Sequence, residues 1–336
     1  MHKSKKIILV LLAVFVLTGC TKYKEYEKKP VIIEQTGQRV VENVLCKTDK
    51  TAEELNKIKV KNIELLTKQL ENKEITQEEL NKKFEELNKT FNVDNIVSCS
   101  EFKVNSNKEG LFTTLFVNTL AWLIIKVGEF TKNYGWAIII VTILIRLVMY
   151  PLTKKTALQS EGLKEAKPKL DKLEAKYRNR TDQEAQMMKS QEMMKIYKDY
   201  KINPMSGCLF ALIQIPLFFA FYEALYRLPV VLEENFLGIN LGLTPLTAFK
   251  AGHYYYAIFI ILVIAATYFS FKLNAADTGG QSQKQMKMMT NMSIIMISIA
   301  SFTISTGIAL YWIINSSFTI VQNLLVKRRK KNDHVA

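Results

Sequence analysis

The chain has 336 residues, of which 49% are hydrophobic, and its formal net charge is +15. Apolar blocks that are long enough to cross a bilayer exclude an ordinary soluble domain and indicate a membrane protein with several spans. The lysines and arginines lie mainly in loops that border these blocks, where the positive-inside effect accounts for them. Nucleic-acid binding is therefore not expected.

The first residues are typical of an exported bacterial lipoprotein. Three lysines within the first six residues precede an apolar run at 7–17, which is too short to cross a bilayer. The tetrapeptide LTGC at 17–20 follows directly and resembles a lipobox. We therefore expect a signal peptide at 1–19 and diacylation of Cys20, with palmitate among the acyl chains. A chance cysteine after an ordinary signal peptide is the alternative.

Residues 20–110 are rich in lysine and glutamate, and after export they would form an extracytoplasmic helical region. Apolar positions at helical spacing predict a helix over 51–71, and Thr76 with Glu79 predicts a capping box at the start of a second helix. Cys46 and Cys99 flank this expected hairpin. Two exported cysteines that bracket one small unit favour a disulfide, and two free thiols are the alternative.

One interfacial helix and five spans are expected after residue 110. The segment 111–133 is apolar but interrupted by Asn118, Lys126, Glu129 and Lys132, so we expect it to lie along the outer membrane interface as an amphipathic helix. The five-span core then covers 134–326. Its expected spans are 134–152, 206–226, 254–273, 288–304 and 307–326, and the last two are joined by a turn at 305–307.

Charge gives the expected orientation of the spans. Residues 154–201 carry thirteen lysines and arginines and the tail at 327–336 carries five, whereas the loop at 228–252 carries one. The two basic segments would face the cytoplasm. An extracytoplasmic, lipid-anchored N-terminus followed by five spans also gives a cytoplasmic C-terminus.

The basic segment 154–201 is itself predicted to form a helical hairpin, with Thr181 or Asp182 capping its second helix. Two interpretations remain open. The hairpin is either a solvated charged loop or an arm that docks on anionic lipid headgroups, on a ribosome or on a nascent chain.

A single arginine, Arg146, lies within the first expected span. An arginine at the centre of a span costs about 2.5–3.5 kcal/mol on insertion scales, so it indicates a functional site. Thr142 and Thr153 extend the polar face of the same helix. The alternative is that the guanidinium reaches the nearby interface, where Lys154 marks the membrane edge.

Polar residues also recur at helical spacing on the other expected spans. On the fifth span they fall on one helical face, and shorter stripes lie on the third and fourth spans. The candidate groove residues are Arg146, Thr142, Gln214, Thr267, Ser270, Asn291, Ser298, Ser301, Trp312, Asn315, Thr319 and Gln322. Such residues either hold helices together or line a hydrophilic groove, and the costly arginine favours the groove.

Enzymatic chemistry is not expected. The only histidines are His2, His253 and His334, the spans contain no aspartate, and no GxxxxGK[ST] phosphate loop is present. We therefore expect no catalytic residues, no metal and no cofactor.

Four groups of residues occur in a characteristic order. They are the arginine-containing span, the sequence MMKIYK at 193–198 followed by Asn203-Pro204, Gly207-Cys208 with Gln214 and Pro216, and the sequence ALYW at 309–312. Together they resemble the YidC/Oxa/Alb family of membrane protein insertases over about residues 112–331. The lipobox suits the lipoprotein form of that family in Gram-positive-type bacteria, whereas residues 20–110 are longer than the pattern of that form.

The resemblance implies an all-α polytopic protein of the bacterial cell membrane whose five transmembrane helices form a hydrophilic groove. Its function would be that of an insertase and chaperone for nascent membrane proteins, alone or with a Sec translocon, with possible ribosome contact. The groove would open to the cytoplasm and the inner leaflet. A small-solute transporter is the alternative, because intramembrane arginines also line substrate paths, although no inverted repeat is evident.

Overall fold

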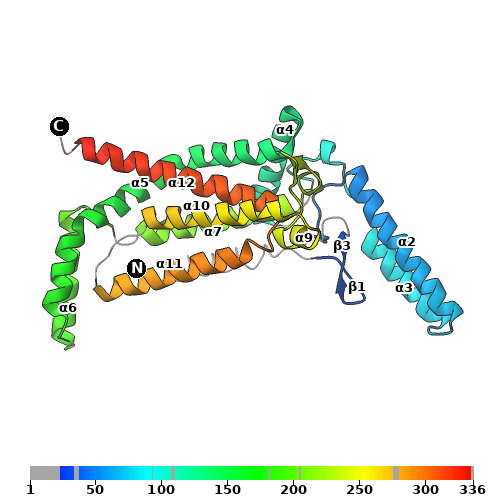
Figure 1. The fold of residues 1–336 in the computed structure, drawn as a ribbon, viewed down its shortest axis with the longest axis horizontal. Helices are drawn as coiled ribbons and strands as arrows, with labels where there is room; N and C mark the ends of the chain where they lie inside the picture. Colours follow the sequence, from blue (N-terminus) through cyan, green and yellow to red (C-terminus); the bar gives the residue numbers. More distant parts are fainter. Residues whose placement is uncertain are drawn as a thin grey trace. The chain divides into compact units, whose positions relative to one another are not determined.

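The computed structural model describes residues 23–33, 38–92, 94–106, 110–180, 182–203, 206–274 and 280–333, and these are mostly helical (Figure 1). Cys20 and the predicted signal peptide lie outside the described residues. The chain forms two compact units. The first comprises the residues up to Val141 together with Pro216–Tyr256 and Ile304–Ile308, and the second comprises Thr142–Ile215, Ala257–Thr303 and the residues from Ala309 onward.

The N-terminal region of the first unit combines two short strand pairs with a helical hairpin. The strands β1 (Glu25–Tyr26) and β2 (Lys29–Pro30) pair antiparallel, as do β3 (Ile32–Ile33) and β4 (Gln38–Arg39). The helices α2 (Asp49–Glu71) and α3 (Gln77–Phe91) pack side by side (Figure 1). Their shared core contains Tyr26, Val31, Val40, Leu55, Leu87 and Phe91. The sequence predicted a purely helical region, and the strand pairs show that this prediction was incomplete.

The second helix of this hairpin begins with the expected capping box. The Glu79 amide donates to Thr76 Oγ1 at 3.2 Å, and the Thr76 amide donates to Glu79 Oε2 at 2.9 Å. These two bonds satisfy amides that a helix N-terminus leaves without a partner inside the helix. The Thr76 hydroxyl also donates to Glu79 Oε2, at 3.2 Å. The bonds from the backbone amide and the hydroxyl of Thr76 stabilise the carboxylate and lower the pKa of the Glu79 carboxyl below its ordinary value.

A disulfide joins Cys46 to Cys99, which precede and follow the hairpin, and both cysteines are buried. The backbone on either side of the bridge is also paired. The Lys47 amide donates to the Val97 carbonyl at 2.9 Å, and the Cys99 amide donates to the Lys47 carbonyl at 3.1 Å. The two ends of the hairpin are thus held together by both covalent and backbone contacts.

The N-terminal region is also bonded to the loop that follows α7 (Ser206–Tyr226). The Arg227 side chain is only 1% exposed and donates from Nε to the Asn43 carbonyl at 2.6 Å, while the Leu45 amide donates to the Arg227 carbonyl at 3.0 Å. Further along the loop, the Thr48 hydroxyl donates to Glu233 Oε1 at 2.8 Å. No sequence pattern predicts these contacts.

The same loop contains several short elements. These are α8 (Pro229–Leu232), the antiparallel pair β5 (Asn235–Phe236) and β6 (Ile239–Asn240), α9 (Pro245–Lys250) and the 3₁₀ helix η3 (Tyr254–Tyr256). The loop is also bonded to the start of the last helix. The Thr306 amide donates to the Leu243 carbonyl at 2.9 Å, and the Gly307 amide donates to the Leu241 carbonyl at 2.8 Å.

The first apolar helix after the N-terminal region begins with a π-helical segment, η2 (Thr113–Val117), and continues as α4 (Asn118–Thr131). It ends at Lys132, which has a left-handed φ of 57°. By length and composition alone, Thr113–Thr131 could cross a membrane. The expectation that it lies along the outer interface remains a prediction.

Four helices among the described residues are long and apolar enough to cross a membrane, at Thr113–Thr131, Tyr134–Tyr177, Tyr254–Leu273 and Thr306–Arg328, and Thr290–Ala300 is a shorter apolar helix. The corresponding elements after α4 are α5 (Tyr134–Tyr177), α10 (Ala257–Asn274), α11 (Gly280–Ala300) and α12 (Thr306–Asp333). The turn before α12 begins at Ser301, which is earlier than the sequence suggests.

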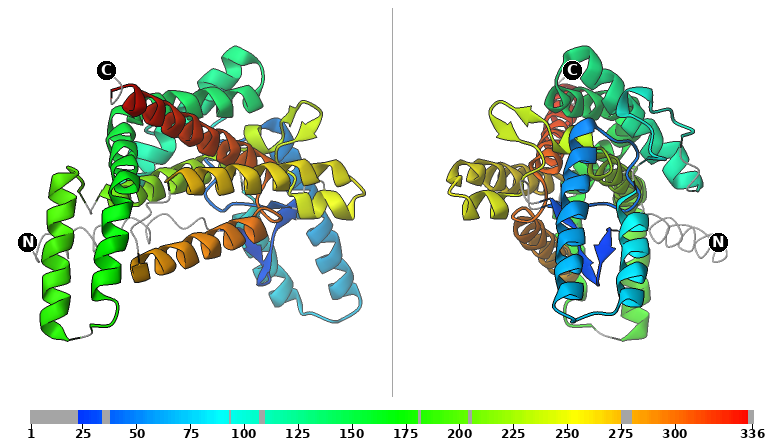
Figure 2. Two further views of the ribbon diagram at one scale, coloured as in Figure 1. Left: turned by 60° about the vertical axis from the view of Figure 1, so that its left-hand side comes forward. Right: turned by 90° about the vertical axis from the view of Figure 1, so that its right-hand side faces the viewer.

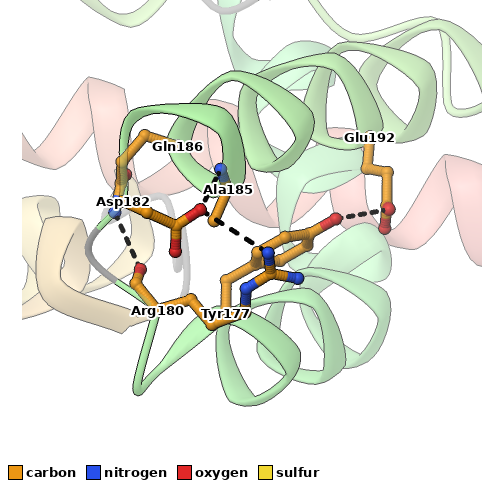
Figure 3. Close-up of polar contacts among 6 residues, drawn as sticks. All are labelled: Tyr177, Arg180, Asp182, Ala185, Gln186 and Glu192. Carbon is orange, nitrogen blue, oxygen red and sulfur yellow. Dashed lines mark hydrogen bonds and ion pairs between the residues drawn. The ribbon is translucent and has the colours of Figure 1, made fainter.

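The basic segment forms a hairpin from the second half of α5 and α6 (Gln183–Asp199), which is drawn in green in Figure 2. Two apolar clusters hold its helices together, one containing Leu163, Ala166, Leu170, Tyr197 and Ile202 and the other containing Leu173, Tyr177 and Ala185. Asp182 caps α6 by accepting from the Ala185 amide at 2.9 Å, and the Tyr177 hydroxyl donates to Glu192 Oε1 at 2.8 Å (Figure 3). Thr181 lies outside the described residues.

Candidate functional site

The centre of the candidate site is Arg146 on α5, whose side chain is only 3% exposed. Its Nε donates to Asn315 Oδ1 on α12 at 2.6 Å. This acceptor lies in the apolar part of α12, between Thr306 and Lys327, so the bond directs the guanidinium toward a neighbouring helix. A hydrogen bond from an ionised donor is stronger than one between neutral groups.

A second polar contact joins the same two helices. The Thr153 hydroxyl and the Gln322 carboxamide exchange hydrogen bonds of 3.1 and 3.0 Å. Thr153 follows Arg146 by seven residues, and Gln322 follows Asn315 by seven residues. Because both steps have the same sign and length, α5 and α12 run parallel here and in register over about 10.5 Å.

A third contact connects α12 to α10. The Trp312 indole Nε1 donates to Thr267 Oγ1 at 2.8 Å, and Thr267 is buried. The polar stripe of α12 therefore faces two helices at once. Trp312 bonds to α10, while Asn315 and Gln322 bond to α5.

The other predicted residues divide by what their polar atoms contact. The hydroxyl groups of Ser298, Ser301 and Thr319 donate to backbone carbonyl oxygens three or four residues earlier in the chain, at 2.7, 2.6 and 3.0 Å. Thr142 is buried, Gln214 and Ser270 are half-buried, and Asn291 is exposed. The structure thus unites Arg146 with Asn315, Gln322 with Thr153, and Trp312 with Thr267.

The electrostatics of this group are unusual for a membrane interior. The acceptor of the Arg146 bond is a neutral amide, so that bond does not neutralise the positive charge. The apolar parts of α5, α10 and α12 contain no aspartate or glutamate. A positive charge held in this way can attract a negative group on another polypeptide, because the screening by water is reduced at a buried position.

Sequence reasoning missed one acidic residue in the helices. Glu223 on α7 is only 4% exposed, and it lies in the first unit near the end of that helix. A buried carboxylate in an apolar helix was the available signal.

Within the described ranges, no group of three or more histidine, cysteine, aspartate or glutamate residues could hold a metal ion. The polar chemistry of the site, as far as the structure describes it, therefore comes from one guanidinium, amides, hydroxyls and an indole.

Comparison with known proteins places this geometry in a family. Residues 126–333 match the family described as 60Kd inner membrane protein. The chain belongs to this family. It is an all-α polytopic membrane protein, and the matched residues contain α5, α10 and α12 in full.

The similar proteins carry the names of insertases. A membrane protein insertase YidC 2 from Listeria monocytogenes is 36% identical over 245 residues, which cover 71% of this chain and 85% of that protein. A membrane protein insertase YidC from Oceanobacillus iheyensis is 33% identical over 238 residues, covering 68% of this chain and 90% of that protein. One from Neisseria gonorrhoeae is 34% identical over 214 residues but is covered over only 36% of its length.

Proposed function

We propose that this chain inserts nascent membrane proteins into the cell membrane and helps them fold. The observation that carries the proposal is the buried Arg146, bonded to a neutral amide inside helices of an insertase family. A structural ion pair would have offered a carboxylate instead of Asn315. The neutral partner leaves the positive charge available to a client.

The proposed mechanism is physical and needs no nucleotide. A polar tail of the client enters a hydrophilic groove that opens to the cytoplasm and the inner leaflet, so it has less hydrocarbon to cross. Arg146 attracts an acidic residue on that tail. The adjoining apolar segment then moves sideways into lipid, and its burial at about 25 cal/mol per Å² drives the step forward.

The contacts divide the candidate residues into two roles. Thr153 with Gln322, and Thr267 with Trp312, fix the helices around the groove. Arg146, with Asn315 orienting it, supplies the charge. Thr142, Gln214, Ser270 and Asn291 remain candidates for the lining, whereas the hydroxyls of Ser298, Ser301 and Thr319 are bonded to nearby backbone carbonyls.

The remaining features of the proposal concern topology and partners. Cleavage before Cys20 and its diacylation would anchor residues 20–110 outside the cell, and the tail at 327–336 would lie in the cytoplasm. The α5–α6 hairpin would then face the cytoplasm, where its lysines suit a nascent chain, a ribosome or anionic headgroups. The protein would work alone or beside a Sec translocon.

The test is reconstitution of the purified full-length protein into liposomes. A single-span client with an acidic tail should become protected from external protease in these vesicles and not in empty ones. Arg146→Ala should reduce protection of that client more than protection of a neutral-tailed one, and Arg146→Lys should retain much of the activity because it keeps the charge.

Two results would contradict the proposal. Equal client protection in empty and loaded vesicles would exclude an insertase acting alone. Uptake of a radiolabelled small solute without client insertion would instead favour the transporter alternative.

A further inference from the structure

The hairpin formed by β5 and β6 has an unexpected residue at its tip. Leu237 and Gly238 form the two-residue turn, with φ values of 53° and 80°. Turns with two left-handed residues favour asparagine, aspartate or glycine at the first position, because a larger side chain is strained there. Leu237 is nevertheless apolar and is 79% exposed. Neither its backbone conformation nor its exposure suits a leucine in water.

One side of this hairpin is fixed to the start of α5. The Phe236 ring packs edge-on against Trp136 at 5.3 Å between centroids, and a Cβ at Gly135 would clash with the Phe236 ring. The side-chain Nδ2 of Asn133 donates to the Asn235 carbonyl at 3.2 Å. The hairpin is therefore held at the level where an apolar, membrane-length helix begins.

The other side is fixed to the residues just before α10. The Asn240 amide donates to the Tyr256 hydroxyl at 3.0 Å. Tyr254 and Tyr255, which precede Tyr256, are 71% and 54% exposed, and Trp136 at the start of α5 is 48% exposed. Tyrosine and tryptophan concentrate where helices leave the hydrocarbon, so both attachments put the hairpin at a membrane–water boundary.

We propose that Leu237 inserts into the lipid of this boundary and that the β5–β6 hairpin is a membrane-contacting loop. Lipid removes the leucine side chain from water, which accounts for an apolar residue where the backbone favours asparagine. The apolar helices that begin beside the hairpin extend into the same lipid. Assigning this lipid to the outer leaflet rests on the proposed function and on the proposed orientation of the spans. The proposal that Leu237 contacts lipid does not depend on either.

The experiment measures the depth of residue 237 in the full-length protein. A ketone-bearing amino acid at this position carries a nitroxide, and the protein is reconstituted in vesicles of phosphatidylglycerol and phosphatidylethanolamine. Collision rates with oxygen and with a water-soluble nickel chelate are then compared. Two matched positions calibrate the measurement: Lys73, an exposed turn residue with φ 60°, and Val148, a 77% exposed residue in the apolar part of α5.

We expect the oxygen-to-nickel ratio at 237 to exceed that at Lys73 at least threefold and to approach that at Val148. A ratio equal to that at Lys73 would overturn the proposal. A photoreactive side chain at 237 provides the second readout, and crosslinks to lipid support the proposal, whereas predominant crosslinks to a translocating client or another protein refute it. The labelled protein should still insert clients, so a failure here is distinguishable from a failure of the proposed function.

Discussion

Asn315→Asp separates the charge of Arg146 from its packing. Aspartate has nearly the shape of asparagine and keeps an acceptor for Arg146 Nε at the position now 2.6 Å away. The substitution changes the formal charge of the pair from +1 to zero. The helices should therefore stay joined while the attraction for an acidic client residue is lost.

The size of the effect follows from Coulomb's law. Two unit charges 4 Å apart attract by about 1 kcal/mol in water and by about 4 kcal/mol at an effective dielectric constant of 20. The lower value corresponds to a roughly fivefold loss of insertion rate, since 1.4 kcal/mol is a factor of ten. Insertion of acidic-tailed clients should thus fall at least about fivefold, and insertion of neutral-tailed clients should change little.

The assay is protease protection of both clients in liposomes that contain equal amounts of each variant. Asn315→Leu serves as the control, because it removes the acceptor and leaves the charge. It should lower the thermal stability, by about 1.5–3 kcal/mol for a hydrogen bond to a charged group, and affect both clients alike. If the Asn315→Asp variant inserts the acidic-tailed client as well as the unchanged protein does, the proposed attraction between Arg146 and acidic client residues is refuted.

Three further predictions concern stability. Replacing Cys46 and Cys99 by serine should destabilise the N-terminal region by about 4 kcal/mol, because the disulfide closes a loop with a sequence separation of 53. Thermal unfolding measures this loss, and free thiols found by mass spectrometry of the native protein would contradict the prediction. Thr153→Val and Gln322→Leu should each cost about 1 kcal/mol, with the double variant costing less than their sum; additive melting shifts would show that the contact is not formed. Glu192 has a pKa below its ordinary value of 4.5, chiefly because Lys176 donates a hydrogen bond to it, so its stabilisation of the basic hairpin is present above that value and is lost as the pH falls through the lowered pKa. The protection factors of the hairpin amides against hydrogen exchange, corrected for the intrinsic exchange rate at each pH, should therefore fall on acidification, and Glu192→Gln should abolish that dependence.

The polar stripes and the basic hairpin could be predicted because helical periodicity is a local property. Asn315 and Gln322 are predicted from their helical spacing and Arg146 from its charge within an apolar span, but the sequence does not say which of them are in contact. The pairing depends on the relative position of α5 and α12, which lie far apart in the chain. The polar residues of the two helices share a step of seven residues, but this match has a meaning only once the contacts between α5 and α12 are known.

Two parts of the fold escaped prediction for physical reasons. Strands of two residues, such as those between Glu25 and Arg39, are too short to show alternation. The sequence predicted a first span at 134–152 and a separate helix of the basic hairpin after it, whereas α5 runs through Pro151 as one helix to Tyr177, and the Thr153 hydroxyl bonds to the carbonyl of Met149 on the same helix. Proline disfavours a continuing helix but does not prevent one.

Arg227 illustrates a different limit. A basic residue at the end of an apolar helix is ordinary for a membrane protein, and nothing nearby distinguishes it. Its contact with Asn43 joins residues 184 positions apart, and only the folded chain reveals it.

The parallel register of α5 and α12 has a consequence for how a client could leave the protein. Separating these two helices sideways would break the Arg146–Asn315 and Thr153–Gln322 contacts at the same time, because both lie along one interface. The charged bond alone makes that opening costly in a medium that cannot hydrogen-bond the released groups. A transmembrane segment released into lipid should therefore exit between other helices, and α5 with α12 should act as a fixed boundary that keeps the arginine in place during each cycle.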